Sequence, residues 1–380
     1  MNKKILIYAT HFHPYKGGLE NFALSLATRF AKRGHSVNIF TYNLDNLKEI
    51  EKYKGVNIYR LPCITILGRT YTLPKFGKTY SELLENVLNQ KYDAVFTNTR
   101  FFTTSWLGAA YMKRVRNTNK SAKFYHIEHG NVHVIHKNPI VTALAWIYDQ
   151  SVGRYIFRKA DKVIGISTPC ADFAKKLGAK KTTVIYNSID TKQFKQVNTN
   201  LKQKLNIKKE DFVVINGIGR LIYAKGLQDT YEAVKNMKNV FVITIGEGPF
   251  EENLKDLAKK LDVKTKFTGR LNTKEIIEYL SIADIFINPS YSEGLPTCVL
   301  EAGAMGLPVI ATDVGGTKEI IKNKKNGWLI NPKDIQTIKN LVDEIIKNRA
   351  DAKKKGENLK KHIKTNFDWN KNIKRFEELL

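Results

Sequence analysis

The sequence predicts an α/β protein with two parallel-sheet domains. Short apolar runs alternate with amphipathic helical segments, and the alternation starts again after a polar interval at residues 190–210. The chain has 380 residues, enough for two separate cores, and its 42% hydrophobic content excludes disorder. We therefore expect two Rossmann-like domains, residues 1–188 and 189–363, which face each other across a cleft.

The first domain begins with an apolar strand at residues 4–10. A loop with Gly17 and Gly18 follows, and residues 19–33 place apolar side chains on one helical face. Further strands are expected at residues 37–41, 94–97, 123–127, 162–166 and 183–186.

The second domain repeats this pattern. Its strands are expected at residues 212–216, 241–245, 265–268, 285–288 and 309–311. Ligands of parallel sheets bind outside the carboxyl ends of the strands, so the loops after these strands are the candidate sites.

Cysteine spacing and hydropathy indicate the cellular compartment of the protein. Cys63, Cys170 and Cys298 are scattered and show no Cys-x-x-Cys spacing, which argues against disulfide and zinc frameworks. No apolar run approaches the roughly 20 residues of a spanning helix, and the apolar start is too short for a signal peptide. A cytoplasmic protein is expected.

The stretch at residues 288–302 follows an apolar run and predicts an anion site. Pro296 is expected at the first position of a helix, because its fixed φ and missing N–H suit that position. The backbone N–H groups of Leu295, Thr297 and Cys298 then lack helical partners at the positive end of the helix. Such a helix start binds anions.

Two carboxylates accompany this helix start. Glu293 lies just before the turn, and Glu301 lies eight residues later, which predicts a position about two turns into the helix. Carboxylates repel phosphate, so we expect them to accept hydrogen bonds from sugar hydroxyls beside a bound phosphate.

A second loop follows the first strand of the second domain. Arg220 and Lys225 lie in the loop between the end of this strand and the start of the next helix. Two cations placed in this way can bind one diphosphate. The alternative is a dinucleotide-binding loop, because Gly217 and Gly219 precede the cations. Ile222 occupies the third glycine position of that motif, so the diphosphate site is favoured.

These motifs resemble those of a known family. The frame Ser292-Glu293-Gly294-Leu295-Pro296, Glu301-Ala302 and residues 306–316 is similar to retaining nucleotide-sugar glycosyltransferases of the GT-B fold, in particular glycosyltransferase family 4. Glu-x7-Glu alone is weak, whereas in this frame of glycines and prolines it is specific. The closing residues also resemble the family, which implies a C-terminal helix, residues 364–380, that returns to the first domain.

The resemblance implies roles for the donor-site residues. Arg220 and Lys225 would neutralise the leaving diphosphate, Glu301 would hold the ribose hydroxyls, and Glu293 would hold the hydroxyls of the transferred sugar. Further donor contacts are implied at the helix start and in two other loops: Gly294, Leu295, Pro296, Thr297, Cys298, Gly246, Gly248 and Arg270.

In the first domain the resemblance places a His-Gly pair at a strand end. His129 would hydrogen-bond the donor sugar or the reaction centre, while Gly17 and Gly18 would let a backbone N–H touch the donor phosphate or the acceptor.

A metal cluster of His126, Glu128, His129 and His133 is an alternative. Strand alternation puts His126 and Glu128 on one face and His129 off it, which argues against a shared metal. A core histidine is a further alternative for His126.

No Asp-x-Asp occurs in the chain, so no divalent metal and no cofactor are expected. The implied donor is a nucleotide sugar, a UDP- or GDP-sugar in preference to an ADP-sugar, and the implied acceptor is a glycan or lipid-linked glycan. A nucleotide-sugar epimerase of the same fold is an alternative. The net charge of +27 also suggests a nucleic-acid-binding protein, but no recognition motif supports nucleic acid as a partner.

The charge distribution suggests an anionic membrane surface as a partner, with the protein peripheral on the inner face of the cell membrane. Residues 52–81 and residues 94–127 contain no acid. The first stretch mixes apolar and aromatic residues with cations and shows no strand period. The second contains a predicted helix at residues 101–116, with Trp106 before Lys113, Arg114 and Arg116. A buried role for Trp106 is the alternative.

Overall fold

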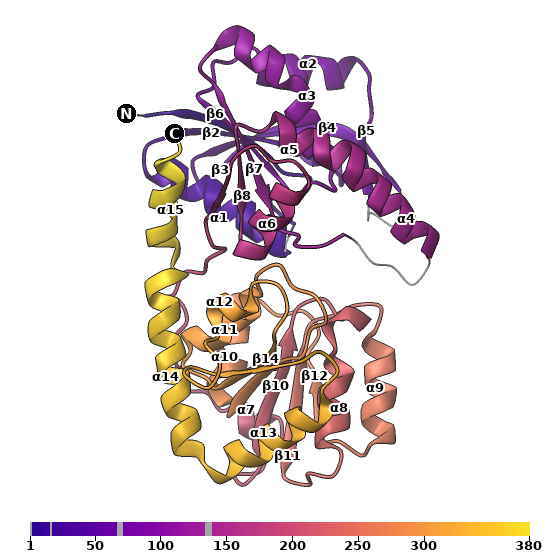
Figure 1. Cartoon of the computed structure of the whole chain (residues 1–380), viewed down its shortest axis with the longest axis vertical. Coiled ribbons are helices and arrows are strands. Elements are labelled where there is room, and N and C mark those ends of the chain that lie inside the picture. Colours follow the sequence, from indigo (N-terminus) through magenta and orange to yellow (C-terminus); the bar gives the residue numbers. More distant parts are fainter. Residues whose placement is uncertain (1, 16, 67–70, 134–138) are drawn as a thin grey trace. The chain divides into compact units, whose positions relative to one another are not determined.

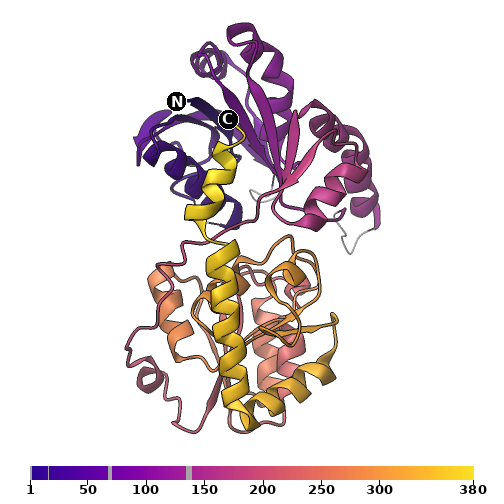
Figure 2. The same cartoon turned by 60° about the vertical axis from the view of Figure 1, so that its left-hand side comes forward.

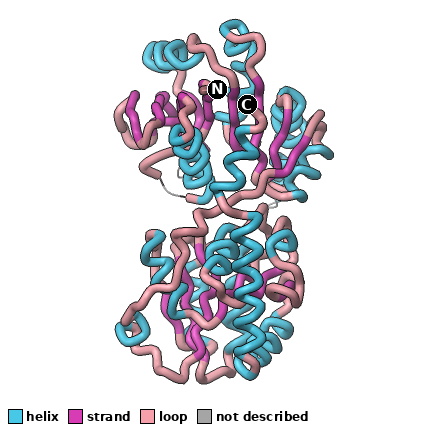
Figure 3. Tube along the Cα trace, turned by 90° about the vertical axis from the view of Figure 1, so that its left-hand side faces the viewer, coloured by secondary structure: helices cyan, strands magenta, loops and turns pink. Residues whose placement is uncertain are grey.

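The computed structural model describes residues 2–15, 17–66, 71–133 and 139–380 (Figure 1). The chain divides into two compact units. Unit 1 comprises Met1–Tyr186 and Ile373–Leu380, and unit 2 comprises Asn187–Asn372. In each unit helices lie on both faces of a sheet, as Figures 1 and 3 show. This arrangement confirms the predicted α/β class with parallel sheets in two domains.

The described sheet of unit 1 has the strand order β3-β4-β2-β1-β6-β7-β8-β9, and β5 pairs with β4. All pairs are parallel except β3 with β4 and β4 with β5. The strands are β1 (Lys4–Tyr8), β2 (Ser36–Asn43), β3 (Ile50–Tyr53), β4 (Val56–Ile66), β5 (Tyr71–Pro74), β6 (Ala94–Asn98), β7 (Lys123–Glu128), β8 (Lys162–Gly165) and β9 (Thr182–Val184). The helices are α1 (Gly18–Lys32), α2 (Lys78–Leu88), α3 (Thr103–Thr118), α4 (Pro139–Tyr148), the π-helical η1 (Asp149–Gly153), α5 (Arg154–Lys159) and α6 (Thr168–Lys176).

The sheet of unit 2 is parallel throughout its described residues, in the order β12-β11-β10-β13-β14-β15. Its strands are β10 (Phe212–Ile218), β11 (Val240–Ile245), β12 (Thr265–Phe267), β13 (Ile285–Asn288), β14 (Val309–Thr312) and β15 (Trp328–Ile330). Its helices are α7 (Leu201–Lys204), η2 (Tyr223–Lys225), α8 (Leu227–Val234), α9 (Glu251–Lys260), α10 (Thr273–Ile282), α11 (Thr297–Ala304), α12 (Thr317–Ile320), α13 (Ile335–Lys347) and α14 (Arg349–Asn366).

The C-terminal helix α15 (Trp369–Glu377) ends in unit 1, as the sequence predicts. Figure 2 shows α14 followed by α15, with the chain ends near each other. The Tyr125 hydroxyl donates to the Leu379 carbonyl, and Glu377 pairs with Arg33. The chain enters unit 1 at residue 373 rather than at the expected residue 364. The reason is that α14 packs on α11, where a Cβ on Gly303 would lie 2.4 Å from Ile363 Cδ1.

The sequence-based prediction missed four strands: β3, β4, β5 and β15. The statement that residues 52–81 have no strand period was wrong, because β4 lies within the sheet and pairs with β2. The alternation of apolar and polar residues in β4 is interrupted by Arg60, a charged residue that is only 1% exposed at a core position. Its guanidinium is satisfied by Glu51 at 2.7 Å and by the His13 carbonyl at 2.7 Å. Residues 67–70 of this stretch lie outside the described residues.

Candidate functional site

The loops after β10 and β13 leave the same edge of the unit 2 sheet. The two strands are parallel neighbours, with Asn216 opposite Ile287. The loops are joined directly, because the backbone N–H of Tyr291 donates to the Ala224 carbonyl at 2.8 Å. Two loops that were separate motifs in the sequence therefore form one site.

Gly226 allows the close approach of these loops. It has a φ of +63°, in the left-handed region that favours glycine, and a Cβ there would lie 2.1 Å from the Pro289 carbonyl oxygen. A side chain at this position would therefore push the two loops apart.

Lys225 and Glu293 meet in this site. The Lys225 Nζ lies 2.7 Å from the Glu293 Oε1, and the two side chains are 28% and 10% exposed. Burial opposes the charge on Lys225, but the Glu293 carboxylate outweighs it, so the pKa of Lys225 is raised. The site therefore contains a charged and partly accessible ammonium group.

Helix α11 begins beside this pair. The structure corrects its predicted start, because Pro296 is the N-cap with φ −72° and ψ 107°, and Thr297 is the first helical residue. The N-cap residue makes no side-chain hydrogen bond to the helix start, so the N–H groups of Thr297 and Cys298 have no capping side chain among the described residues. The Cys298 thiol is buried against the Asn288 Oδ1 at 3.5 Å. Burial, followed by the Glu293 charge, raises the pKa of Cys298 to about 12, so this thiol is neutral.

Glu301 lies about one turn into α11, not two as predicted, because four of the eight residues that separate it from Glu293 come before the first helical residue, Thr297. Its side chain is partly exposed. No hydrogen bond or ion pair of its carboxylate is found in the part of the chain that the structure describes. Burial raises the pKa of Glu301 to about 7. An unpaired carboxylate in a low-dielectric environment is stabilised when a ligand hydroxyl donates a hydrogen bond to it.

The other predicted donor residues of unit 2 surround the loop after β10. Arg220 is exposed and forms no ion pair with any described residue. A Cβ on Gly246 would lie 1.8 Å from the Gly219 carbonyl oxygen, and one on Gly248 would lie 2.3 Å from that of Leu221. Both glycines thus let neighbouring loops pack closely. Arg270 is exposed and lies 3.8 Å from Glu247.

Several side chains that hold these loops were not singled out in the sequence. The Tyr291 hydroxyl donates to Asp229 at 2.9 Å and accepts from Gln228 at 2.7 Å. The N–H of Gly316 donates to the Gly294 carbonyl at 2.9 Å. Gly316 and Tyr291 lie within or near the motif frame, whereas nothing in the sequence marks Asp229.

In unit 1, His129 follows β7, the strand that pairs with β6. Its ring meets the Phe22 ring edge to face at 4.8 Å between centroids. Burial lowers the pKa of His129 to about 4, so the imidazole is neutral at neutral pH. Its Nε2 is buried and has no hydrogen-bond partner among the described residues. A substrate hydroxyl would satisfy this nitrogen.

A buried ionic network lies beside His129. Arg100 Nη1 donates to Glu128 Oε1 at 2.8 Å, and its Nε donates to Asp149 Oδ1 at 2.6 Å. Glu128 Oε1 also accepts from the Gly130 N–H at 2.7 Å, and Glu128 Oε2 lies 3.2 Å from His126 Nε2. Glu128 is thus paired with an arginine. The network fixes the turn that carries His129.

Gly17 and Gly18 lie at the start of α1, next to a carboxylate. A Cβ on Gly17 would lie 2.2 Å from Glu20 Oε2, and Glu20 Oε1 lies 3.4 Å from His11 Nδ1. A small cavity of about 20 Å³ lies between His11, Glu20 and Asn98. A carboxylate at this position favours a hydroxyl-bearing ligand over a phosphate.

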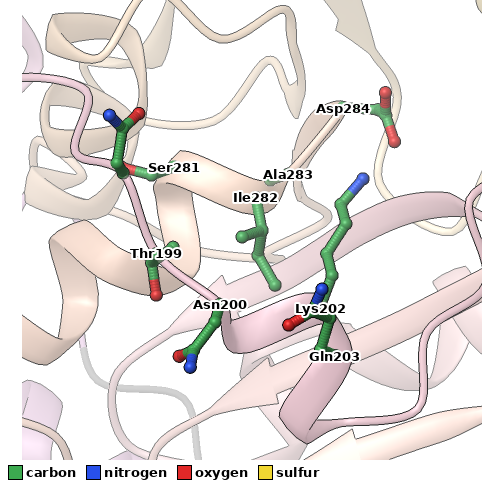
Figure 4. Close-up of a pocket in the computed structure, with 9 residues that line it drawn as sticks. Thr199, Asn200, Lys202, Gln203, Ser281, Ile282, Ala283 and Asp284 are labelled. Atoms are coloured by element: carbon green, nitrogen blue, oxygen red, sulfur yellow. The ribbon is translucent and has the colours of Figure 1, made fainter.

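A wider groove of about 750 Å³ lies elsewhere in unit 2 (Figure 4). It is lined by Thr199, Lys202, Ser281 and Asp284, among others, and contains none of the predicted residues. Asp284 immediately precedes β13, so this groove lies at the amino edge of the sheet. The residues predicted to bind the donor in unit 2 lie at the opposite edge.

Two family models match the chain. Glycosyltransferase Family 4 matches residues 16–193, and Glycosyl transferases group 1 matches residues 197–362. The chain is 29% identical to an uncharacterised glycosyltransferase of Methanocaldococcus jannaschii, over 99% of this chain and 97% of that protein. It is 26% identical to the alpha-monoglucosyldiacylglycerol synthase of Streptococcus pneumoniae, over 86% of this chain and 75% of that one.

Solved structures with the GT-B fold resemble the whole chain. Sucrose-phosphate synthase from Thermosynechococcus elongatus has a TM-score of 0.81 at 21% identity, covering 100% of this chain and 98% of that one. HepE from Anabaena, in complex with UDP-glucose, has a TM-score of 0.80 at 21% identity, covering 100% and 99%. The fold is GT-B, and the chain belongs to the group 1 glycosyl transferases of glycosyltransferase family 4.

Proposed function

We propose that this glycosyltransferase retains anomeric configuration and moves a sugar from a nucleotide diphosphate sugar to an acceptor hydroxyl. Unit 2 binds the donor, and unit 1 binds the acceptor. The observation that carries the proposal is the junction of the Lys225–Glu293 pair with the uncapped start of α11, next to the unpaired carboxylate of Glu301. It combines groups suited to a diphosphate with groups suited to sugar hydroxyls.

The diphosphate is held by positive charge and backbone N–H groups. A lysine ammonium has three N–H donors, and Glu293 uses one of them on Lys225, so two can reach phosphate oxygens. Arg220 adds a second cation, and the helix start adds N–H groups at Thr297 and Cys298. Because these groups supply the charge that a divalent metal would otherwise supply, the reaction is proposed to be metal-independent.

The two carboxylates bind different parts of the donor. Glu301 accepts from the ribose hydroxyls, and Glu293 accepts from hydroxyls of the transferred sugar while it orients Lys225. Gly246, Gly248 and Arg270 contact the nucleotide base from neighbouring loops. These roles follow the family resemblance and the partners found at each position.

The reaction breaks the bond between the anomeric carbon and the diphosphate oxygen and forms one to the acceptor oxygen. The Cys298 thiol is buried and neutral, so it is not suited to act as a covalent nucleophile. The acceptor hydroxyl attacks on the face from which the diphosphate leaves, and its proton passes to a phosphate oxygen. The neutral His129 hydrogen-bonds the donor sugar or the reaction centre. The acceptor reaches the turn at Gly17 and Gly18, where the Glu20 carboxylate favours a hydroxyl.

Relatives suggest the substrates. The HepE complex with UDP-glucose supports a UDP-sugar donor, and the monoglucosyldiacylglycerol synthase supports a lipid acceptor. We therefore propose a cytoplasmic enzyme of cell-surface or lipid-linked glycan assembly that uses a UDP- or GDP-sugar. None of the described helices is long and apolar enough to cross a membrane.

A thermal-shift screen against UDP, GDP, ADP and their sugars tests donor binding, because a ligand of the folded state raises the melting temperature. Glu301→Ala is the matched variant and should show a smaller shift at the same nucleotide concentration. The sugar nucleotide that binds is then incubated with candidate acceptors, and the anomeric configuration of the product is read by NMR. An inverted product would contradict retention, and conversion of the donor to its epimer without an acceptor would favour the epimerase.

A further inference from the structure

Helix α4 is apolar and exposed. Its ten residues carry no charge, and none of them is buried. Leu144, Trp146 and Ile147 are 60%, 52% and 53% exposed. Single exposed apolar side chains are common, but a whole helix of this kind marks an interaction surface. Figure 1 shows α4 extending away from the sheet of unit 1.

A second apolar surface lies close to the base of α4. The antiparallel pair of β4 and β5 exposes Ile64, Ile66 and Tyr71. The Thr103 hydroxyl donates to the Thr72 carbonyl of β5 at 2.8 Å, and the nearby Phe101 ring stacks on the Tyr148 ring at the end of α4, with 5.9 Å between centroids. Residues of two distant segments thus extend one apolar surface.

A basic groove continues along the same helical run. It has a volume of about 600 Å³, and its lining includes Arg154, Tyr155, Arg158, Lys159 and Lys180. None of these cations forms an ion pair with a described carboxylate. Arg154 Nε is buried without a hydrogen-bond partner in the described part of the chain. The groove therefore offers several unneutralised donors to an anion.

We propose that α4, with the exposed end of the β4–β5 pair, docks unit 1 on an anionic lipid bilayer. A helix of ten residues is about 15 Å long, too short to span the roughly 30 Å hydrocarbon core, so it lies in the interface. The apolar end enters the acyl boundary while the groove binds phosphate headgroups. A second copy of this chain would instead bring two basic grooves together, which repel each other.

This surface is connected to the turn that carries His129. The Tyr148 hydroxyl donates to the Arg100 carbonyl at 2.9 Å, and Asp149 pairs with the Arg100 guanidinium. Arg100 in turn pairs with Glu128, which holds the Gly130 N–H. The docked helix therefore lies beside the acceptor side of unit 1, and, resting on the proposed function, this arrangement favours a membrane-linked acceptor.

Vesicle flotation tests the docking. The protein should float with phosphatidylglycerol–phosphatidylcholine vesicles but not with phosphatidylcholine alone, and less at high salt. Leu144→Glu/Ile147→Glu should weaken binding at least ~10-fold, because both side chains are exposed and their loss removes apolar surface. Arg158→Glu/Lys180→Glu should do the same through charge. The matched controls in unit 2, Val197→Glu and Lys353→Glu/Lys354→Glu, should bind as the native protein does.

Tryptophan fluorescence gives a second measurement. Trp328 and Trp369 are buried, so Trp106→Phe leaves Trp146 as the one exposed tryptophan of the chain's described part. Its emission should shift to the blue on anionic vesicles and be quenched by brominated lipids.

Absence of binding at low salt, or binding unchanged by Leu144→Glu/Ile147→Glu, overturns the proposal. A dimer that the same variant dissociates, without vesicle binding, would identify a second copy as the occupant. Thermal shift with nucleotides in solution reports on unit 2 separately, so failure of docking and failure of the donor site are distinguishable.

Discussion

The Lys225 ammonium lies 2.7 Å from the Glu293 carboxylate and links two loops that are 68 residues apart in the sequence. The pair keeps Lys225 charged in a site where burial alone would favour the neutral amine. It also holds Glu293 beside the start of α11. One contact therefore orients a group suited to the diphosphate and a group suited to the sugar.

Removal of either donor-site cation should slow transfer strongly. Arg220→Ala or Lys225→Ala should reduce turnover at least ~100-fold, the scale of losing a preorganised charge stabiliser. Initial rates with saturating donor measure the effect. Lys235→Ala, a surface cation of the same unit, is the control. A loss of only a few fold at both sites would place the diphosphate elsewhere.

Glu293→Gln should separate catalysis from nucleotide binding. The amide keeps the shape of the side chain but loses the charge that pairs with Lys225, so turnover should fall while nucleoside diphosphate affinity is retained. Calorimetry with the nucleotide and steady-state kinetics measure the two quantities. A variant that loses nucleotide affinity and keeps its turnover would exclude contact with the transferred sugar.

Glu301 should make nucleotide binding depend on pH. Glu301→Ala should weaken it by about 1.5–3 kcal/mol, the range for a hydrogen bond to a charged group. The ionised carboxylate is the better acceptor and its pKa is raised to about 7, so affinity should rise as pH increases through 7. Calorimetry of Glu301→Gln controls for titration of the phosphate, and an unchanged pH profile would argue against the ribose contact.

The same shift predicts an effect on stability with a defined sign. A folded pKa of about 7, above the ordinary value of 4.5, means that the folded state binds more protons between these values. The contribution of Glu301 to stability is present below pH 4.5 and is lost as pH rises through 7. In denaturant titrations, Glu301→Gln should therefore gain stability relative to the native protein as pH rises through this window.

Activity should survive excess EDTA. The chain contains no Asp-x-Asp, and Arg220, Lys225 and the start of α11 are available for the diphosphate. Rates measured before and after chelation, with magnesium or manganese added back, test this prediction. Abolition by EDTA followed by metal rescue would contradict it.

The buried network of Arg100 should be essential for the stability of unit 1. Arg100→Leu deprives the buried Glu128 and Asp149 of the arginine charge that both pair with, and loss of one partner of a buried pair costs about 3–5 kcal/mol. Chemical denaturation followed by circular dichroism measures the loss. Arg114→Leu, which breaks an exposed pair with Glu85, should cost no more than about 1 kcal/mol.

The membrane surface that we propose differs from the one suggested by composition. Arg114 pairs with Glu85 and Arg116 pairs with Asp161, while much of the apolar face of α3 is buried. Arg114 and Arg116, which looked available in the sequence, are thus neutralised by distant acids. Helix α4, which the sequence did not single out, carries the exposed apolar side chains instead.

The sequence alone determined the order of the main strands and helices and the motifs that resemble the family. Apolar periodicity and turn chemistry are local, so they can be found without knowledge of the fold, and they identified β10, β13 and the helix after Pro296. Local pattern failed at β4, where the buried Arg60 breaks the apolar alternation. The sequence-based estimate also placed Glu301 one turn too deep, because it counted the eight residues from Glu293, which lies in the loop before α11.

Tertiary structure alone decided which of these residues meet. Sheet order makes β10 and β13 neighbours although β11 and β12 lie between them in the sequence, and this order brings Lys225 to Glu293. Burial then sets the charge states, so that Glu301 and His129 have pKa values far from their ordinary ones. These properties depend on the solvent and charges that surround each group in the folded chain, and neighbours in sequence do not specify them.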